Sequence, residues 1–128
     1  MIYIATATSL NTKNISLPEI LLIHPDYISD YYNKLNGTKE VEVAAFYDNK
    51  KFIIVLKSDF DIASIADQAT LAHEMVHHYQ ILNNVPRDCN AQLERQAYKL
   101  SNRWLKEHGG EVVADDFTIF IRSICADY

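Results

Sequence analysis

The stretch 62–79, IASIADQATLAHEMVHHY, carries the strongest structural pattern in this chain of 128 residues. Its apolar positions recur at steps of three and four residues: Ile62, Ile65, Ala69, Ala72, Val76 and Tyr79. Such spacing puts one apolar stripe along an α-helix. Asn83, Asn84 and Pro86 follow and are typical of a helix end. The sequence therefore predicts one long helix with a single apolar side.

A second helix is predicted downstream, where apolar residues again recur at helical spacing. Its stripe consists of Leu93, Ala97, Leu100 and Trp104. The glycines at 109–110 end this helix. The tail 115–125 fits either a helix or a strand, and we favour the helix because Asp115 and Asp116 are good N-cap residues.

Upstream of the long helix, the segments 41–47 (VEVAAFY) and 51–56 (KFIIVL) are rich in β-branched and aromatic residues. The polar residues 48–50 between them suit a tight turn, so a β-hairpin is predicted. The resulting fold class is α+β, with a β-hairpin or small antiparallel sheet packed on the long helix.

The segment 17–35 is predicted to be helical, because Ser16 and Pro18 suit the start of a helix. Pro25 interrupts the segment and divides it into two short helices. Gly37 then ends the second of them.

The composition predicts a single globular domain over residues 1–128, since glycine and proline are scarce, with three of each. The formal net charge is -5, and the only adjacent basic pair is Lys50-Lys51. Nucleic acid and anionic membranes are therefore not expected as partners, because both bind basic surfaces.

The first ten residues lack the charged and apolar regions of a secretory signal, and no window reaches the roughly 18 apolar residues of a membrane span. The sequence therefore favours the cytoplasm. The two cysteines, Cys89 and Cys125, are compatible with a disulfide or with two reduced thiols.

The chemistry of the long helix lies in His73-Glu74-Met75-Val76-His77, which fits the pattern H-E-x-x-H. Residues four apart lie on the same helix face, so both imidazoles can reach one zinc ion at about 2.0–2.1 Å. Glu74 is offset by one position and flanks the metal. That is the place of a general base that takes a proton from water.

A catalytic zinc ion usually has three protein ligands and one open position. Glu94 is the best third ligand, because it lies 17 residues after His77 on the next predicted helix. The small residue Ala97, on the same face as Glu94, lets the two helices approach closely. Three acidic or histidine residues remain as alternative ligands: Asp88, His108 and Asp116.

The segments 71–78 (LAHEMVHH) and 94–97 (ERQA) resemble the two zinc-binding signatures of gluzincins, metallopeptidases of the thermolysin type. The resemblance implies a zincin-like domain that hydrolyses peptide bonds. It implies His73, His77 and Glu94 as zinc (Zn²⁺) ligands and Glu74 as the catalytic base.

The resemblance also implies that an upstream strand, 41–47 or 51–56, lines the cleft and pairs with an extended peptide. The chain is much shorter than the large gluzincins and has no room for their separate helical domain. It therefore resembles the minimal, single-domain members of the group.

Gluzincins commonly use a Tyr, His or Arg side chain to stabilise the oxyanion beside the metal. Tyr98 is the leading candidate because it shares the helix face of Glu94, and Tyr47 is available from the predicted strand. Three further side chains remain alternatives: His78, Arg95 and His108.

Two functions therefore follow from the sequence. The first is a zinc peptidase acting on a peptide or protein substrate. The second is a non-catalytic domain that is stabilised by zinc and binds a protein partner. Structural zinc sites are usually closed and rich in sulfur, whereas Cys89 and Cys125 show no C-x-x-C spacing, so the sequence favours the peptidase.

Overall fold

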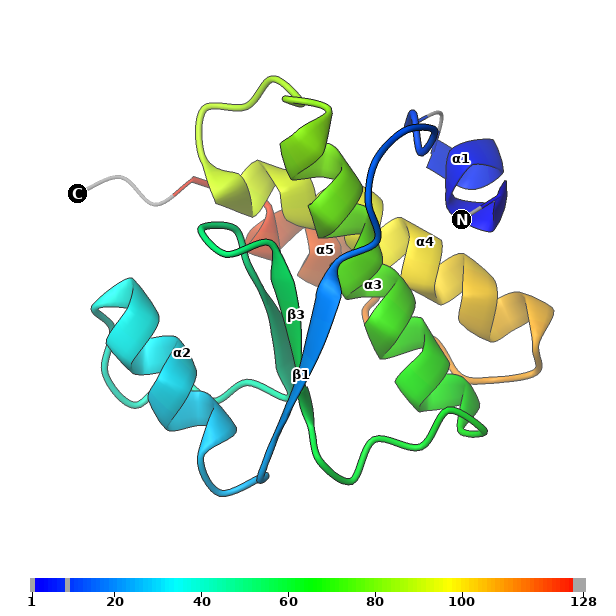
Figure 1. Cartoon of the computed structure of the whole chain (residues 1–128). Helices are drawn as coiled ribbons and strands as arrows, with labels where there is room; N and C mark the ends of the chain where they lie inside the picture. The colour runs from blue at the N-terminus through cyan, green and yellow to red at the C-terminus, as the bar shows by residue number, and fades with distance from the viewer. Residues whose placement is uncertain (1, 9, 126–128) are drawn as a thin grey trace.

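A three-stranded sheet lies at the centre of the computed structural model, which describes residues 2–8 and 10–125 (Figure 1). β1 (Glu19–Ile23) pairs in parallel with β3 (Ile53–Lys57). β2 (Ala45–Asp48) pairs antiparallel with the other side of β3. The strand order is therefore β1-β3-β2, and both β1 and β2 are edge strands.

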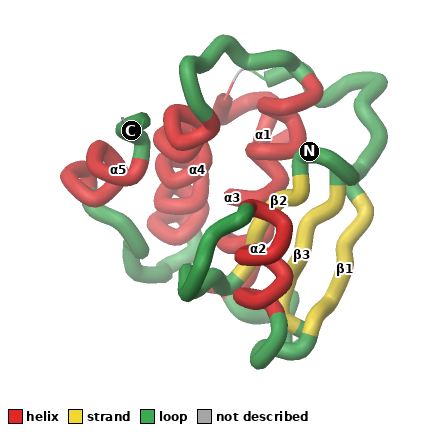
Figure 2. The backbone as a smooth tube through the Cα atoms, turned by 90° about the vertical axis from the view of Figure 1, so that its left-hand side faces the viewer, coloured by secondary structure: helices red, strands yellow, loops and turns green. Residues whose placement is uncertain are grey.

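Helices surround the sheet. Along the chain they are α1 (Ile2–Thr8), α2 (Ile28–Asn36), α3 (Ile65–Leu82), the short 3-10 helix η1 (Asn90–Leu93), α4 (Glu94–Glu107) and α5 (Asp116–Arg122). Figure 1 shows α2 on one face of the sheet and α3 on the other. α4 lies beside α3, and α5 packs on the outer side of α4 (Figure 2). The described residues thus form a small α+β domain.

The core has two parts because β3 is buried on both faces. Ile54 and Leu56 pack with residues of α3 and α4, whereas Val55 packs with Ile28 of α2 and Phe46 of β2. A strand that is covered on both sides has a continuous apolar sequence, because neither face has to be polar. The unbroken apolar run 53–56 has this cause.

The predicted hairpin and the second half of the predicted segment 17–35 are confirmed, although residues 41–44 of the predicted first strand are irregular. β2 and β3 form the hairpin, and α2 ends at Gly37, whose backbone φ of 66° suits glycine. The first half of the segment is wrong, because β1 stands where we predicted a helix. Pro18 and Pro25 leave too few residues between them for a stable helix, and an apolar run of that length pairs equally well as a strand.

The sheet also differs from the predicted antiparallel one. β1 joins it in parallel, with Glu19 opposite Ile53 and Ile23 opposite Lys57. Parallel neighbours need a crossover connection, and α2 lies in the connection between these two strands. The sheet is therefore mixed, which the sequence did not indicate because β1 was assigned to a helix.

Both predicted long helices are present, but the single apolar side predicted for the first is wrong: Ile62 lies before α3 and is exposed, and the consecutive residues 73–76 of α3 are all buried. α3 begins after Ser64, whose side chain accepts a hydrogen bond from the backbone N–H of Asp67 at 3.2 Å. α3 and α4 run side by side in roughly opposite directions (Figure 1). Ala97 of α4 is fully buried, with 0% of its surface exposed, and belongs to the core that both helices share.

The tail forms the helix that we favoured, and the side chain of Asp115 caps it by accepting a hydrogen bond from the backbone N–H of Thr118 at 2.7 Å. The cysteines are joined in a disulfide between Cys89 and Cys125. This bridge ties the segment before η1 to the segment after α5, so the end of α5 is held near the start of α4.

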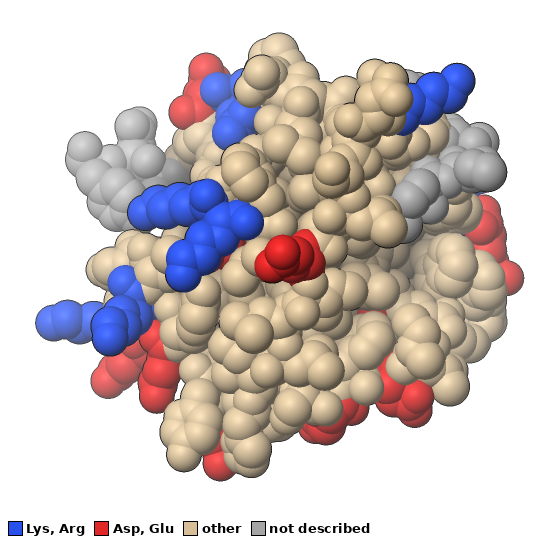
Figure 3. Space-filling view, viewed as in Figure 1, with Lys and Arg blue, Asp and Glu red and all other residues tan. Residues whose placement is uncertain are grey.

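β1 carries exposed apolar side chains on both of its faces. Ile20, Leu21 and Leu22 are all exposed there. Figure 3 shows most of the charged side chains toward the edges of this view, with broad uncharged areas between them. No helix in the described ranges is long and apolar enough to cross a bilayer.

The close contact of α3 and α4 predicts that Ala97→Leu lowers the free energy of unfolding. The added atoms overfill a buried position, which costs about 1–3 kcal/mol. Urea unfolding followed by circular dichroism measures the change. Ala66→Leu, at an exposed position of α3, is the matched control and should stay within about 0.5 kcal/mol. Equal stability of both variants would contradict the tight packing at Ala97.

Candidate metal centre

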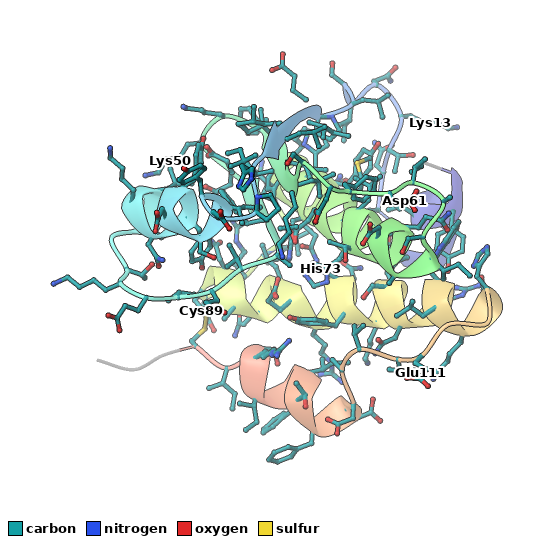
Figure 4. The ribbon with its side chains drawn as sticks, turned by 90° about the horizontal axis from the view of Figure 1, so that it is seen from below. Lys13, Lys50, Asp61, His73, Cys89 and Glu111 are labelled. Atoms are coloured by element: carbon teal, nitrogen blue, oxygen red, sulfur yellow. A yellow bond between two sulfur atoms is a disulfide. The ribbon has the colours of Figure 1, made fainter. Side chains whose placement is uncertain are left out.

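The two histidines of the motif lie one turn apart on α3, and His73 lies between α3 and α4 (Figure 4). Their Nε2 atoms are 3.2 Å apart. Both side chains are largely buried, with 11% and 13% of their surfaces exposed. A helix brings them together because residues at i and i+4 share one face.

Glu94, the first residue of α4, completes the group. Its Oε1 atom lies 3.4 Å from Nε2 of His73 and forms an ion pair with Nε2 of His77. The structure thus brings together the three residues that the sequence singled out as ligands. Two imidazole nitrogens and one carboxylate oxygen converge on one point between the helices.

This donor set fits a zinc ion. Ligand atoms at 2.0–2.1 Å around a tetrahedral ion are about 3.4 Å from each other. The separations from His73 Nε2 to the other two atoms, 3.2 and 3.4 Å, agree with that value, whereas His77 Nε2 and Glu94 Oε1 are in direct contact, closer than two ligands of one ion. Nitrogen and carboxylate ligands are the set found in catalytic zinc sites with three protein ligands.

Gln80 fixes the orientation of His77. The Gln80 side chain is buried, and its Nε2 donates to the carbonyl oxygen of Leu93 at 3.0 Å and to Oε1 of Gln96 at 2.8 Å. Gln96 Nε2 in turn donates to the carbonyl of Thr8 at 3.2 Å. Because carbonyl oxygens only accept, both amides have one allowed orientation.

Gln80 Oε1 must therefore accept a hydrogen bond, and His77 Nδ1 lies 2.9 Å away. The proton of neutral His77 is then on Nδ1, and the lone pair of Nε2 faces His73 and Glu94. This is the tautomer that a metal ligand needs, because a hydrogen bond at the other ring nitrogen orients ligating histidines.

Charge interactions within the group are strong. Burial works to lower the pKa of His77, but its hydrogen bond to Glu94 and the negative charges of Glu74 and Glu94 outweigh burial and raise that pKa to about 8. Burial alone would raise the pKa of Glu94. Its hydrogen bonds to the two histidines are stronger and hold the pKa of this carboxyl well below its usual range.

Glu74 lies beside the three convergent atoms. Its Oε1 is 3.9 Å from Nε2 of His73, and 7% of the residue is exposed. Ligand-type atoms of Glu74 and both histidines all lie within 4.8 Å of each other. Burial raises the pKa of Glu74, although the two histidines act against it. The side chain is therefore within reach of a water molecule at the centre.

Tyr98 lies one turn after Glu94, and its ring packs edge-to-face against His73, with 4.5 Å between the ring centres. Its hydroxyl oxygen accepts a hydrogen bond from Nη1 of Arg122 at 2.6 Å. Burial raises the pKa of Tyr98, and the charge of Glu94 adds to it, while Arg122 works in the opposite direction. Because Arg122 uses a lone pair of the oxygen, the phenol hydrogen stays available for donation.

The other oxyanion candidates are engaged elsewhere. Nε2 of His78 lies 2.8 Å from the carbonyl of Ser16, so it carries the proton, and Nδ1 accepts from the Tyr47 hydroxyl at 2.8 Å. His108 stacks on Trp104 at the far end of α4, with 3.9 Å between ring centres.

The alternative ligands lie outside the group as well. Asp88 is exposed and hydrogen-bonds with Gln92, and Asp116 is exposed in the first turn of α5. Arg95, the last oxyanion candidate, is an exposed residue of α4 that lines a different cavity.

The centre opens into a cleft of about 750 Å³. α3 and α4 contribute the residues of the centre, β2 and the end of α2 form the opposite wall, and Arg122 reaches the cleft from α5. Of the two strands considered above, only β2 has a free edge, because β3 is paired on both sides. Three β2 residues, Ala45, Phe46 and Tyr47, line the cleft.

Two residues of the site were missed from the sequence. Gln80 follows His77 by three positions, so helical spacing alone could have placed it on the face of the histidines. Arg122 gave no such signal, because it reaches the site only through the packing of α5 on α4.

Residues 3–128 match a family described as a domain of unknown function (DUF6647), and the chain belongs to this family. No curated protein and no solved structure matches the chain. The family description names no activity, so the function must be inferred from the geometry of the site.

The raised pKa of His77 predicts a pH dependence of stability in the metal-free protein. Since the pKa is about 8 in the folded state and 6.5 ordinarily, the stabilisation is complete below pH 6.5 and is lost as pH rises through 8. The free energy of unfolding should fall by about 2 kcal/mol over this window.

Urea unfolding of the protein in excess chelator at several pH values measures this decrease. His77→Asn should reduce the decrease, and Glu74, whose pKa burial also raises, accounts for what remains. His24→Asn, which changes an exposed histidine, should leave it unchanged. A decrease of the same size in His77→Asn would assign the titration to another group.

Proposed function

We propose that this protein is a zinc-dependent peptidase with a zincin-like fold. The observation that carries the proposal is the convergence of His73, His77 and Glu94 on one point, with the Glu74 carboxylate beside it. The donor atoms come from two helices, and the centre faces an open cleft. His73, His77 and Glu94 hold the zinc ion in this proposal.

A bound zinc ion supplies Lewis acidity toward water and toward a carbonyl oxygen. Glu74 accepts a proton from the water whose oxygen attacks the scissile carbonyl carbon. It then passes this proton to the amine nitrogen as the carbon–nitrogen bond breaks. The raised pKa of Glu74 suits both roles, because the group both accepts and releases a proton.

Tyr98 supports the same reaction. Its ring is fixed by His73 on one side and its oxygen by Arg122 on the other. The phenol hydrogen can donate to the carbonyl oxygen as negative charge develops on that atom. A donor held in place in this way stabilises the charge without having to reorganise.

The cleft suits an extended peptide. The outer edge of β2 offers backbone N–H and C=O groups, so a substrate strand can pair there while its scissile bond lies over the centre. The opposite wall, formed by α4 and Arg122, leaves room for substrate side chains. We therefore propose peptides, or exposed extended segments of proteins, as substrates.

The alternative, a zinc site that only stabilises the fold, has less support. Structural sites usually take four ligands and are rich in cysteine. Cys89 and Cys125 are bonded to each other and offer no thiolate. Glu74 is a buried carboxylate in addition to the three convergent groups, and a purely structural site has no use for it.

The direct test is Glu74→Gln. This change should reduce peptide hydrolysis by about two to four orders of magnitude, because the general base is lost. It should leave about one zinc ion per chain. Cleavage of a peptide library by mass spectrometry measures the first effect, and elemental analysis measures the second.

Glu107→Gln is the matched control, because Glu107 is an exposed partner of Arg103 on α4. It should keep full hydrolysis. Undiminished cleavage by Glu74→Gln would refute the mechanism, and absence of zinc from the unmodified protein would refute the metal centre.

The role of Gln80 gives a second prediction. Gln80→Leu keeps the side-chain size but removes the acceptor of His77 Nδ1, so zinc affinity should fall by about 10- to 100-fold. Competition with a chromophoric chelator measures the affinity. Gln92→Leu, an exposed position before α4, should keep the original affinity. Equal affinities of the two variants would show that the Gln80 contact does not orient the ligand.

A further inference from the structure

Arg122 is the last residue of α5 and lies on the wall of the cleft. Its guanidinium carbon is 5.3 Å from the centre of the Tyr98 ring, and its Nη1 donates to the Tyr98 hydroxyl at 2.6 Å. An arginine on an aromatic face gains a cation–π contact and keeps a defined orientation. The position of this positive charge is therefore set by its contacts with Tyr98.

The guanidinium has no carboxylate partner in the part of the chain that the structure describes. Arg103, by contrast, is paired with Glu107 at 2.9 Å. A guanidinium has five N–H donors in a fixed plane, and the hydrogen bond to Tyr98 uses one of them. Within residues 2–8 and 10–125 no other acceptor pairs with Arg122, so its remaining donors can bind a ligand.

α5, which carries Arg122, is tied to the rest of the fold at both of its ends. Asn102 of α4 donates to the carbonyl of Ala114, just before α5, at 2.7 Å. The disulfide holds Cys125, three residues after Arg122, to Cys89. α5 is thus anchored at both ends, which holds the backbone of Arg122 beside the cleft.

We propose that Arg122 binds a carboxylate group of the substrate on the α5 side of the cleft. Planar guanidinium and carboxylate groups form two parallel hydrogen bonds, which give both affinity and orientation. The carboxylate comes from an acidic side chain or from the C-terminus of the peptide. The inference rests on the proposed peptidase function and specifies its substrate class.

The other charged groups of the cleft restrict where a carboxylate can bind. Glu42, Glu74 and Glu94 are acidic and repel a carboxylate. Lys50, the other cation of the lining, belongs to the β2–β3 turn and lies on the far side of the centre from α5 (Figure 4). Arg122 is therefore the cation that a carboxylate meets on the α4–α5 side.

Peptide binding tests the proposal without turnover. Three peptides of one sequence serve as probes: a capped peptide with an internal glutamate, the same peptide with glutamine, and the glutamine peptide with a free C-terminal carboxylate. Each is titrated into the zinc-loaded Glu74→Gln protein. Calorimetry gives the affinity, and the Nε–H resonance of Arg122 reports contact with the guanidinium.

At least one carboxylate peptide should bind about tenfold more tightly than the neutral peptide, as one charge-assisted pair provides. If the glutamate peptide binds most tightly, Arg122 recognises an acidic side chain. If the peptide with the free C-terminal carboxylate binds most tightly, Arg122 recognises a peptide C-terminus. In each case Arg122→Gln should abolish the preference but keep the affinity for the neutral peptide. Arg122→Lys should restore part of the preference for the carboxylate peptide.

Arg95→Gln is the matched control, since it removes a positive charge of α4 outside this cleft. It should keep the preference. No preference in the Glu74→Gln protein, or an unchanged preference in Arg122→Gln, would overturn the proposal while leaving zinc binding and hydrolysis intact.

If the protein bound no zinc, the proposed peptidase function would fail separately. The same titrations with the metal-free protein would then decide the role of Arg122. A shift of its Nε–H resonance with the carboxylate peptides alone supports the proposal, and equal shifts with all three peptides contradict it.

Discussion

The close packing of α4 on α3 at Ala97 is the constraint on which the centre depends. A methyl side chain at this buried position lets the two helices approach, and Glu94, one turn earlier, then reaches both imidazoles. Burying a carboxylate is costly unless it is paired. The close packing of α3 and α4 that buries Glu94 also places it beside His73 and His77, which keep its carboxylate ionised. Packing and electrostatics therefore favour the same arrangement.

The polar chain behind His77 limits how the helices can slide past each other. Gln80 of α3 bonds to Gln96 of α4 and to the carbonyl of Leu93, and Gln96 bonds to Thr8 of α1. A shift of one helix by a turn would leave buried amides without partners, which costs more than the bonds themselves contribute. α3, α4 and the distant α1 are thus held in one register, and that register is the one in which His77 faces Glu94.

The sequence predicted those parts of the structure that depend on local spacing. α3, α4 and the hairpin follow from periodicity, and the grouping of His73, His77 and Glu94 follows from helix geometry together with a short connection. β1 was missed because a short apolar run between two prolines fits a strand or a helix, and its partner β3 decides between them. Arg122 was missed because only tertiary packing brings α5 to the cleft.

The ligand set lies within residues 73–94, a small part of the chain. Closing a short loop costs little conformational entropy, and the cost rises only slowly with length. The α3–α4 pair can therefore form its contacts early in folding, before the sheet, whose strands begin far upstream, is complete. An ion bound by these residues would hold the helical hairpin closed in a partly unfolded chain, so the centre would be among the last regions to lose its structure.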